Sequence, residues 1–114
     1  MTTYTVIFAP EAVESLVELY QYVAEHGSPS VAQRYTDAIV KHCESLATFP
    51  LRGTQRDDVR PGLRVTNFRR RTVIAFEVDV GARQVAILGV FYGGRDYESA
   101  LGAATAWENT AEDS

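Results

Sequence analysis

The chain has 114 residues, of which 46% are hydrophobic, and its formal net charge at pH 7 is −4. This length predicts one domain with a single packed core and excludes an additional cofactor-binding domain. The chain contains no apolar run of about 18 residues that could span a membrane. Its N-terminus also lacks the basic region of a signal peptide, so we expect a cytoplasmic protein.

The charges are distributed unevenly along the chain. Residues 52–95 contain nine arginines and four acidic residues, whereas residues 1–51 have a net charge of −4 and residues 96–114 carry five acidic residues and no basic one. This asymmetry predicts a basic functional surface on an otherwise acidic protein. Lys41 is the only lysine. The surface would therefore contact carboxylates or phosphates through the planar, bidentate guanidinium groups of arginine.

The cysteine and histidine content argues against a metal site. A single cysteine, Cys43, excludes an intramolecular disulfide and a thiolate cluster. Its place on the apolar side of a predicted helix indicates a buried, inert thiol. His26 and His42 are isolated from each other in the sequence. We therefore expect no metal and no cofactor.

The first half of the chain predicts a strand followed by two helices. Residues 5–9 form a short β-rich run. Pro10 suits the first turn of a helix that ends at Gly27, and Pro29, preceded by a serine cap, starts a second helix. The second helix should stop before Pro50, because the residue ahead of a proline avoids the α region.

Both predicted helices carry apolar residues at intervals of three and four, which marks one helical face. The two stripes are formed by Val13, Leu16, Val17, Tyr20, Val23 and Ala24 in the first helix and by Val31, Tyr35, Ala38, Ile39, His42, Leu46 and Phe49 in the second. A very short link would join the helices into an antiparallel hairpin. Neither helix can bury its stripe alone, so the hairpin needs a sheet or a partner.

The second half of the chain predicts strands joined by turns. After a loop over residues 51–62, a strand is expected over 63–68, and the arginine triplet 69–71 forms a turn or a bulge. The next strand covers residues 73–80 and alternates between its two faces. Gly81-Ala82 then supplies a two-residue turn, in which Gly81 can adopt a positive φ.

The last strand and the C-terminus complete the pattern. Residues 85–92 are apolar on both faces, which is typical of a central strand covered on both sides, and Gly89 can mark a bulge. Residues 96–101 predict a short helix capped by Asp96. Residues 103–114 are small and acidic, and form either a ragged helix or a disordered tail.

Several motifs in this order resemble those of a known family. They are the helical hairpin, Phe49-Pro50 followed by Gly53, the segment Arg60-Pro-Gly-Leu-Arg64, and Val85 to Asp96. Together they resemble the ParE/RelE superfamily of bacterial type II toxins, and the ParE branch in particular, over residues 4–101. The resemblance implies an α+β fold of order β-α-α-β-β-β, with three or four antiparallel strands packed by the hairpin and a short C-terminal helix. One toxin domain would cover residues 1–102, followed by the acidic tail 103–114.

The resemblance also implies a function. ParE-type toxins poison DNA gyrase, whereas RelE-type relatives cut messenger RNA in the ribosomal A site, and a cognate antitoxin holds both inactive. Tyr92 stands where the family commonly has histidine, and Gly89 where arginine is frequent. In an alignment with the RelE-like nucleases, Gly93-Gly94 would fall near the terminal catalytic pair, and Thr66 or Asn67 would fall where a catalytic arginine is expected. These differences, the missing histidine, the near absence of lysine and the net charge of −4 favour a gyrase-binding growth regulator that is not an enzyme. The basic segment leaves the metal-independent ribonuclease open, and a third alternative is a non-toxic member that only binds its antitoxin.

The expected site residues follow from these hypotheses. Arg64, Arg71, Tyr92 and Arg95 are the candidates for target binding, and no residue is assigned a catalytic role. Alternatively, Arg64 and Arg95 stabilise the fold by pairing with acids such as Asp96, and Tyr92 closes the core. Candidates for an antitoxin-binding groove are Val17, Tyr20, Tyr35 and Ile39. The chain has no helix-turn-helix and no basic helix, so direct sequence-specific DNA binding is not expected.

Overall fold

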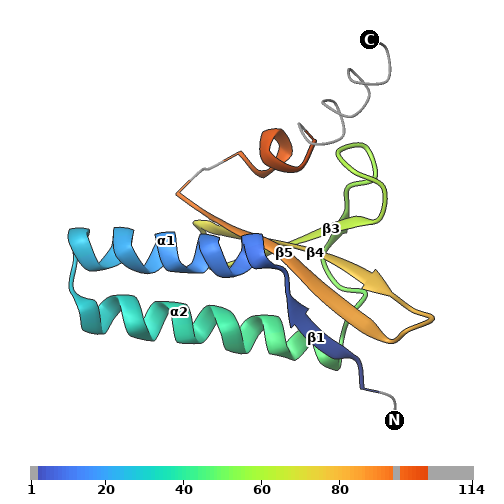
Figure 1. Cartoon of the computed structure of the whole chain (residues 1–114), viewed down its shortest axis with the longest axis horizontal. Coiled ribbons are helices and arrows are strands. Elements are labelled where there is room, and N and C mark those ends of the chain that lie inside the picture. Colours follow the sequence, from blue (N-terminus) through green and yellow to red (C-terminus); the bar gives the residue numbers. More distant parts are fainter. Residues whose placement is uncertain (1–2, 94–95, 103–114) are drawn as a thin grey trace.

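The computed structural model describes residues 3–93 and 96–102. In chain order the elements are β1 (Thr5–Phe8), α1 (Pro10–His26), α2 (Pro29–Glu44), the 3-10 helix η1 (Ser45–Ala47), β2 (Thr54–Gln55), β3 (Leu63–Phe68), β4 (Thr72–Asp79) and β5 (Gln84–Tyr92). Residues 97–102 form one further short helix. Figure 1 shows α1 and α2 running antiparallel side by side, with residues 97–102 (orange-red) apart from them. The predicted α+β fold class is confirmed.

The sheet has five strands in the order β1-β5-β4-β3-β2. β1 pairs with β5 in parallel, from Thr5 opposite Gln84 to Phe8 opposite Ile87, and the other neighbours pair antiparallel. The sheet is therefore mixed, and not the purely antiparallel sheet of three or four strands that the resemblance implied. The added strand β2 has only two residues, too short for a periodic signal.

The helix starts agree with the sequence signals. Pro10 and Pro29 are the first residues of α1 and α2, and the Ser28 hydroxyl accepts the Val31 amide hydrogen at 3.2 Å. The end of α2 was predicted too late, because the α-helix stops at Glu44 and gives way to η1. Phe49 does not continue the buried stripe, since 65% of it is exposed. A proline sets the last position that a preceding helix can reach, but the helix can end earlier, as α2 does here.

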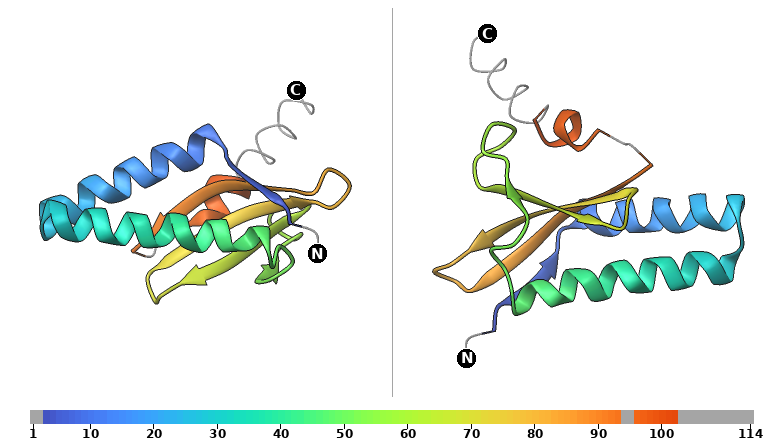
Figure 2. Two further views of the ribbon diagram at one scale, coloured as in Figure 1. Left: turned by 90° about the horizontal axis from the view of Figure 1, so that it is seen from below. Right: turned by 180° about the vertical axis from the view of Figure 1, so that it is seen from behind.

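The buried face of α1 differs from the predicted stripe. Ala12 and Leu19 are buried, whereas Val13 and Val17 are 49% and 51% exposed. Ala12 and Leu19 lie seven residues apart on one helical face, and Leu16 and Val23 of the predicted stripe pack against the same core. The stripe is therefore rotated, with Val13 and Val17 at its outer side. Figure 2 shows the hairpin crossing the sheet. The core beneath it consists of Ala12, Leu19, Ile39, Cys43, Leu46, Ile74, Phe76, Val85, Ile87 and Val90.

The strand connections show one confirmed prediction and one error. Residues 69–71 form the predicted turn, but the β4–β5 turn spans residues 80–83, because Asp79 and Gln84 are the last pair. The Asp79 carboxylate accepts the Ala82 amide hydrogen at 2.9 Å and shapes this longer turn. Its positive φ, 55°, belongs to Arg83 and not to Gly81.

Two local features near the C-terminus were predicted correctly. The β4–β5 register shifts so that Leu88 is the extra residue beside Gly89, which confirms the bulge. Asp96 caps the helix of residues 97–102 by accepting the Ser99 amide hydrogen at 3.1 Å. The predicted tail, residues 103–114, lies outside the described residues. Among the described helices, none is long and apolar enough to cross a membrane.

Candidate binding site

The three long strands come together at one end of the sheet and place three side chains in a row. Thr72, at the start of β4, pairs with Phe68 on one side and with Tyr92 on the other. Thr72 is only 1% exposed, so its hydroxyl needs a partner. The Tyr35 hydroxyl of α2 supplies it at 2.7 Å. This hydrogen bond fixes α2 against the end of the sheet.

An aromatic cluster surrounds Tyr92 at this end. The Tyr92 ring lies 5.6 Å from Tyr22 of α1 and 5.8 Å from Tyr35 of α2, and Tyr35 also meets Phe68 edge-on at 5.7 Å. The His26 ring stacks on Tyr22 at 4.2 Å. Ring pairs at these distances stabilise a contact beyond the area that they bury. Tyr92 therefore helps to close the core while part of it stays exposed.

The arginine turn, residues 69–71, adjoins the aromatic cluster. Arg69 has a positive φ of 55°, and its guanidinium lies over the rings of Phe68 and Tyr35, at 4.9 and 5.3 Å from their centres. Arg71 is exposed, and its carbonyl accepts the amide hydrogen of Gly93 at 2.9 Å. The turn is thus fastened to the residue after Tyr92. Arg69 therefore contacts the aromatic cluster directly, and Arg71 is held beside Tyr92 through Gly93.

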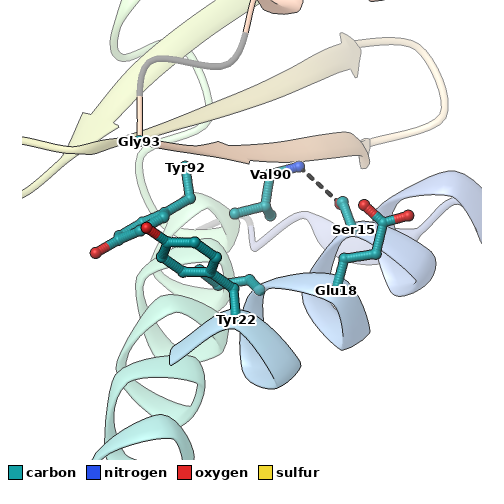
Figure 3. A pocket seen from close by; sticks show the side chains of 7 residues that line it. Ser15, Glu18, Tyr22, Val90, Tyr92 and Gly93 are labelled. Carbon is teal, nitrogen blue, oxygen red and sulfur yellow. Dashed lines mark hydrogen bonds between the residues drawn. The ribbon is translucent and has the colours of Figure 1, made fainter. Parts of the chain in front are cut away.

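A cavity of about 150 Å³ opens between α1 and the end of β5. Figure 3 shows Tyr22 and Tyr92 at one side of it and Ser15 and Glu18 at the other. The Ser15 hydroxyl accepts the Val90 amide hydrogen and donates to the Ala12 carbonyl, both at 2.9 Å. β1 pairs with β5 only as far as Ile87, so Ser15 takes the place of a strand partner for Val90.

The predicted target-binding residues do not all meet at this site. Arg71 and Tyr92 lie together, whereas Arg64 pairs with Phe76, four positions before Phe68 on β3 and roughly 13 Å away at 3.3 Å per residue. Arg64 instead donates to the carbonyl oxygens of Leu51 and Arg52, at 2.6 and 3.2 Å. It therefore supports a loop, and within residues 3–93 and 96–102 it forms no salt bridge with an acid. Arg95 lies outside the described residues.

Sequence reasoning missed Ser15 and Tyr22 as site residues. Both lie on the α1 face that contains Ser15, Leu19, Tyr22 and His26, which are spaced at four, three and four residues. This spacing marks a helical face as clearly as the predicted stripe does. A serine and a histidine among its members hid the signal.

The predicted antitoxin-groove residues divide into two pairs. Val17 and Tyr20 line an open groove between the helices, on the face away from the sheet, together with Leu16, Thr36 and Val40. Ile39 is fully buried in the core, and Tyr35 is turned towards the sheet through Thr72. Of these four residues, only Val17 and Tyr20 line the groove.

Cys43 and the Nε2 atom of His42 are both buried in the interior of the fold. Burial raises the pKa of the Cys43 thiol to about 12, which agrees with the inert thiol that was expected. Burial, together with the nearby Arg52 guanidinium, lowers the pKa of His42. Among the described residues, no group of three or more histidine, cysteine, aspartate and glutamate side chains could hold a metal ion.

A family model described as the ParE toxin of the type II toxin–antitoxin system parDE matches residues 6–97. The chain belongs to the ParE toxin family. It is therefore a type II toxin of the ParE/RelE superfamily, and the resemblance seen in the sequence is confirmed. No curated protein matches this ParE-family chain in sequence.

Solved structures share its fold. The chromosomal ParDE system of P. aeruginosa gives a TM-score of 0.68 at 20% identity, over 79% of this chain and 96% of that one. The RelBE2 toxin–antitoxin complex of Mycobacterium tuberculosis gives 0.59 at 22% identity, over 80% and 99%. A mutant of the E. coli toxin RelE in the free state gives 0.58 at 14% identity, over 91% and 98%. Both branches of the superfamily therefore have this fold.

Proposed function

We propose that this ParE-family toxin stops growth by binding DNA gyrase, without being an enzyme. The observation that carries the proposal is the match of residues 6–97 to the ParE family model. The composition of the site supports it, because Tyr92 is packed between two other tyrosine rings and both histidines have structural contacts. Such a surface is suited to binding through shape and charge. Gyrase is a cytoplasmic target, so the proposal also places the toxin in the cytoplasm.

The target-binding surface in this proposal is the arginine turn with Tyr92. Arg71 is exposed, and Arg69 is held over two aromatic rings, which reduces the entropy that it loses on binding. Arg95, two residues after Gly93, is proposed for the same surface. Arg64 would contribute indirectly, by holding the loop at Leu51. The partner surface would present carboxylates or phosphates to these guanidinium groups.

The cognate antitoxin would neutralise the toxin through the outer groove of the hairpin. Val17 and Tyr20 line this groove, and Val17 is half exposed. An amphipathic helix buries its apolar face in such a groove. An acidic antitoxin tail would then be attracted to the arginine turn.

A second candidate is ribosome-dependent cutting of messenger RNA. The juxtaposition of the arginine turn with Tyr92 favours it, since guanidinium groups can stabilise the charge that develops on a phosphate during cleavage, and a tyrosine can move a proton. The overall charge of −4 opposes it, because phosphate contacts dominate RNA affinity.

Two assays on the purified toxin separate the candidates. We expect inhibition of gyrase supercoiling with accumulation of cleaved DNA, and no cutting of messenger RNA on programmed ribosomes. The double variant R69A/R71A should lose at least about tenfold in inhibition, the loss expected from removing one charged contact. R34A, which removes an exposed arginine of α2, is the matched control.

The outcomes discriminate clearly. Cutting of messenger RNA with gyrase unaffected would replace the gyrase proposal by the ribonuclease. If the chain is expressed without the neighbouring antitoxin gene and the cells show no growth defect, the non-toxic, antitoxin-binding alternative would be favoured.

A further inference from the structure

Two large apolar side chains project from the loop that follows η1. Phe49 is 65% exposed and Leu51 is 58% exposed, and an open hollow lies over residues 48–52. The loop is held in shape, because the Arg64 guanidinium donates to the carbonyl of Leu51 at 2.6 Å. Gly53, with φ of 82°, itself lies against the backbone of Val65, where an added Cβ would come within 2.3 Å of the carbonyl oxygen. A fixed loop that exposes apolar side chains binds a partner with little loss of conformational entropy.

The charge beside this apolar pair is positive. Between residues 45 and 55 the only charged residue is Arg52, which is exposed. The Arg64 guanidinium lies beside the same loop. We call Phe49, Leu51 and Arg52 the loop patch.

A complementary surface lies on the first half of α1. Val13 and Val17 are 49% and 51% exposed, and they stand one helical turn apart, which places their Cβ atoms about 5–6 Å from each other. Glu14 is exposed beside them, and residues 10–25 contain no basic residue. We call Val13, Glu14 and Val17 the helix patch. It is an apolar pair with a negative neighbour, whereas the loop patch is an apolar pair with a positive one.

We propose that a second copy of this chain covers both patches, with the loop patch of each protomer on the helix patch of the other. A loop-to-loop contact would bring two copies of Arg52 together and is disfavoured by charge repulsion. The loop-to-helix contact pairs Arg52 with Glu14 and the apolar side chains with one another.

The two patches lie at the same end of the hairpin. The start of α1 and the end of α2 are next to each other beside β1 (Figure 1). A twofold axis at this end makes both contacts at once and closes the assembly as a dimer. The apolar area in these patches is small, so the dimer is weak and depends on concentration. Val13 and Val17 also border the groove that we propose for the antitoxin, so an antitoxin helix would compete with the second copy.

Sedimentation velocity of the purified full chain over a wide concentration range tests the proposal. The weight-average mass should rise from the 12.6 kDa of the monomer towards twice that value. F49D should raise the dissociation constant by roughly tenfold or more, as expected for loss of an aromatic anchor. R52E and E14R should each weaken the dimer, and the double variant R52E/E14R should restore it, because the pair is recreated with reversed charges.

The control is V80D, which changes an equally exposed apolar side chain (60%) in the β4–β5 turn and should leave the dimer unchanged. Circular dichroism of each variant identifies any that has failed to fold, and the charge-reversed pair does not depend on the apolar substitution. A monomer at every concentration would overturn the proposal. Association that F49D weakens no more than V80D, or that the charge-reversed pair does not restore, would overturn it too.

Discussion

Gly53 and Gly62 show how much the surroundings of a single residue matter. Both have φ of 82°, a conformation that side-chain-bearing residues rarely adopt. A Cβ added at Gly62 would meet no atom within 4 Å, whereas one added at Gly53 would lie 2.3 Å from the carbonyl oxygen of Val65. The sequence marks both positions as turns. Only the structure shows that Gly53 is in close contact with strand β3.

This difference predicts unequal costs for the same substitution. G62A should lower the free energy of unfolding by about 1–2 kcal/mol, the cost of the left-handed conformation alone. G53A should lower it further, because the backbone of β3 has to move as well. Urea denaturation of the two variants measures the difference. Equal losses would show that the loop relaxes freely around Gly53.

At the scale of the element, the hydrogen bonding of β5 is completed by the Ser15 side chain beyond the point where β1 ends. β1 pairs with β5 only up to Ile87, and beyond that point the Ser15 hydroxyl of α1 accepts the Val90 amide hydrogen. A helix thus completes the hydrogen bonding of a sheet. The same contact sets the spacing between α1 and β5 and so the width of the cavity beside Tyr92.

S15A should therefore destabilise the fold by about 1–3 kcal/mol, the cost of a buried amide left without an acceptor. Thermal denaturation measures the loss, and hydrogen exchange of the Val90 amide localises it. S30A, at an exposed position near the start of α2, is the control and should change stability little. Unchanged exchange at Val90 in S15A would show that another acceptor replaces the hydroxyl.

A second element-scale contact holds the short helix of residues 97–102. The Arg56 guanidinium binds the Asp58 carboxylate at 2.9 Å and Glu98 at 3.5 Å, and it also contacts the Tyr97 hydroxyl. Tyr97 in turn packs near Phe91 of β5, with ring centres 6.2 Å apart. One arginine therefore links the loop after β2 to the C-terminal helix.

R56A should release this helix while the sheet and the hairpin stay folded. Limited proteolysis should then cut the chain after Asp96 faster than in the unmodified protein, and added salt should have a smaller effect on the rate in the variant. R60A, which removes a more exposed arginine and its pair with Glu77 at 3.5 Å, is the control. Equal cleavage of both variants would show that Arg56 does not hold the helix.

At the scale of the whole molecule, stability is linked to pH through His42. Its ring packs against Phe68 at 5.3 Å, and its Nε2 atom is buried without a hydrogen-bond partner among the described residues. Burial lowers the pKa of His42 below its ordinary value of 6.5, and the Arg52 charge lowers it further. The unfolded chain therefore binds this proton more readily than the folded chain does.

The contribution of His42 to the free energy of unfolding should be largest above pH 6.5. It should decrease as the pH falls from 6.5 towards the lower pKa of His42 in the folded chain. H42L removes the titrating group, so the decrease over this range should become smaller. Urea denaturation across the range measures it, with H26Q, at the exposed end of α1, as the control. A pH profile identical in H42L and the unmodified protein would contradict the assignment.

The sequence by itself determined the features that depend on local chemistry. Pro10, Pro29 and the Ser28 cap set the helix starts, the 63–68 strand was located by its composition, and Asp96 marked the last helix. The order of these elements, together with Phe49-Pro50 and the Gly-Gly-Arg-Asp exit, was enough to identify the family. These signals can be read locally because each involves a residue and its near neighbours.

Only the tertiary structure decided which surfaces face the core and which residues meet. It turned Val13 and Val17 outwards, buried Ile39, separated Arg64 from Tyr92 and brought Tyr22 and Arg69 to the aromatic cluster. Helical periodicity identifies a face but not the element that covers it, and strand residues distant in sequence become neighbours only through register. The described arginines of the basic segment therefore do not form one surface in the folded chain: Arg64 holds the loop at Leu51, whereas Arg69 lies at the aromatic cluster.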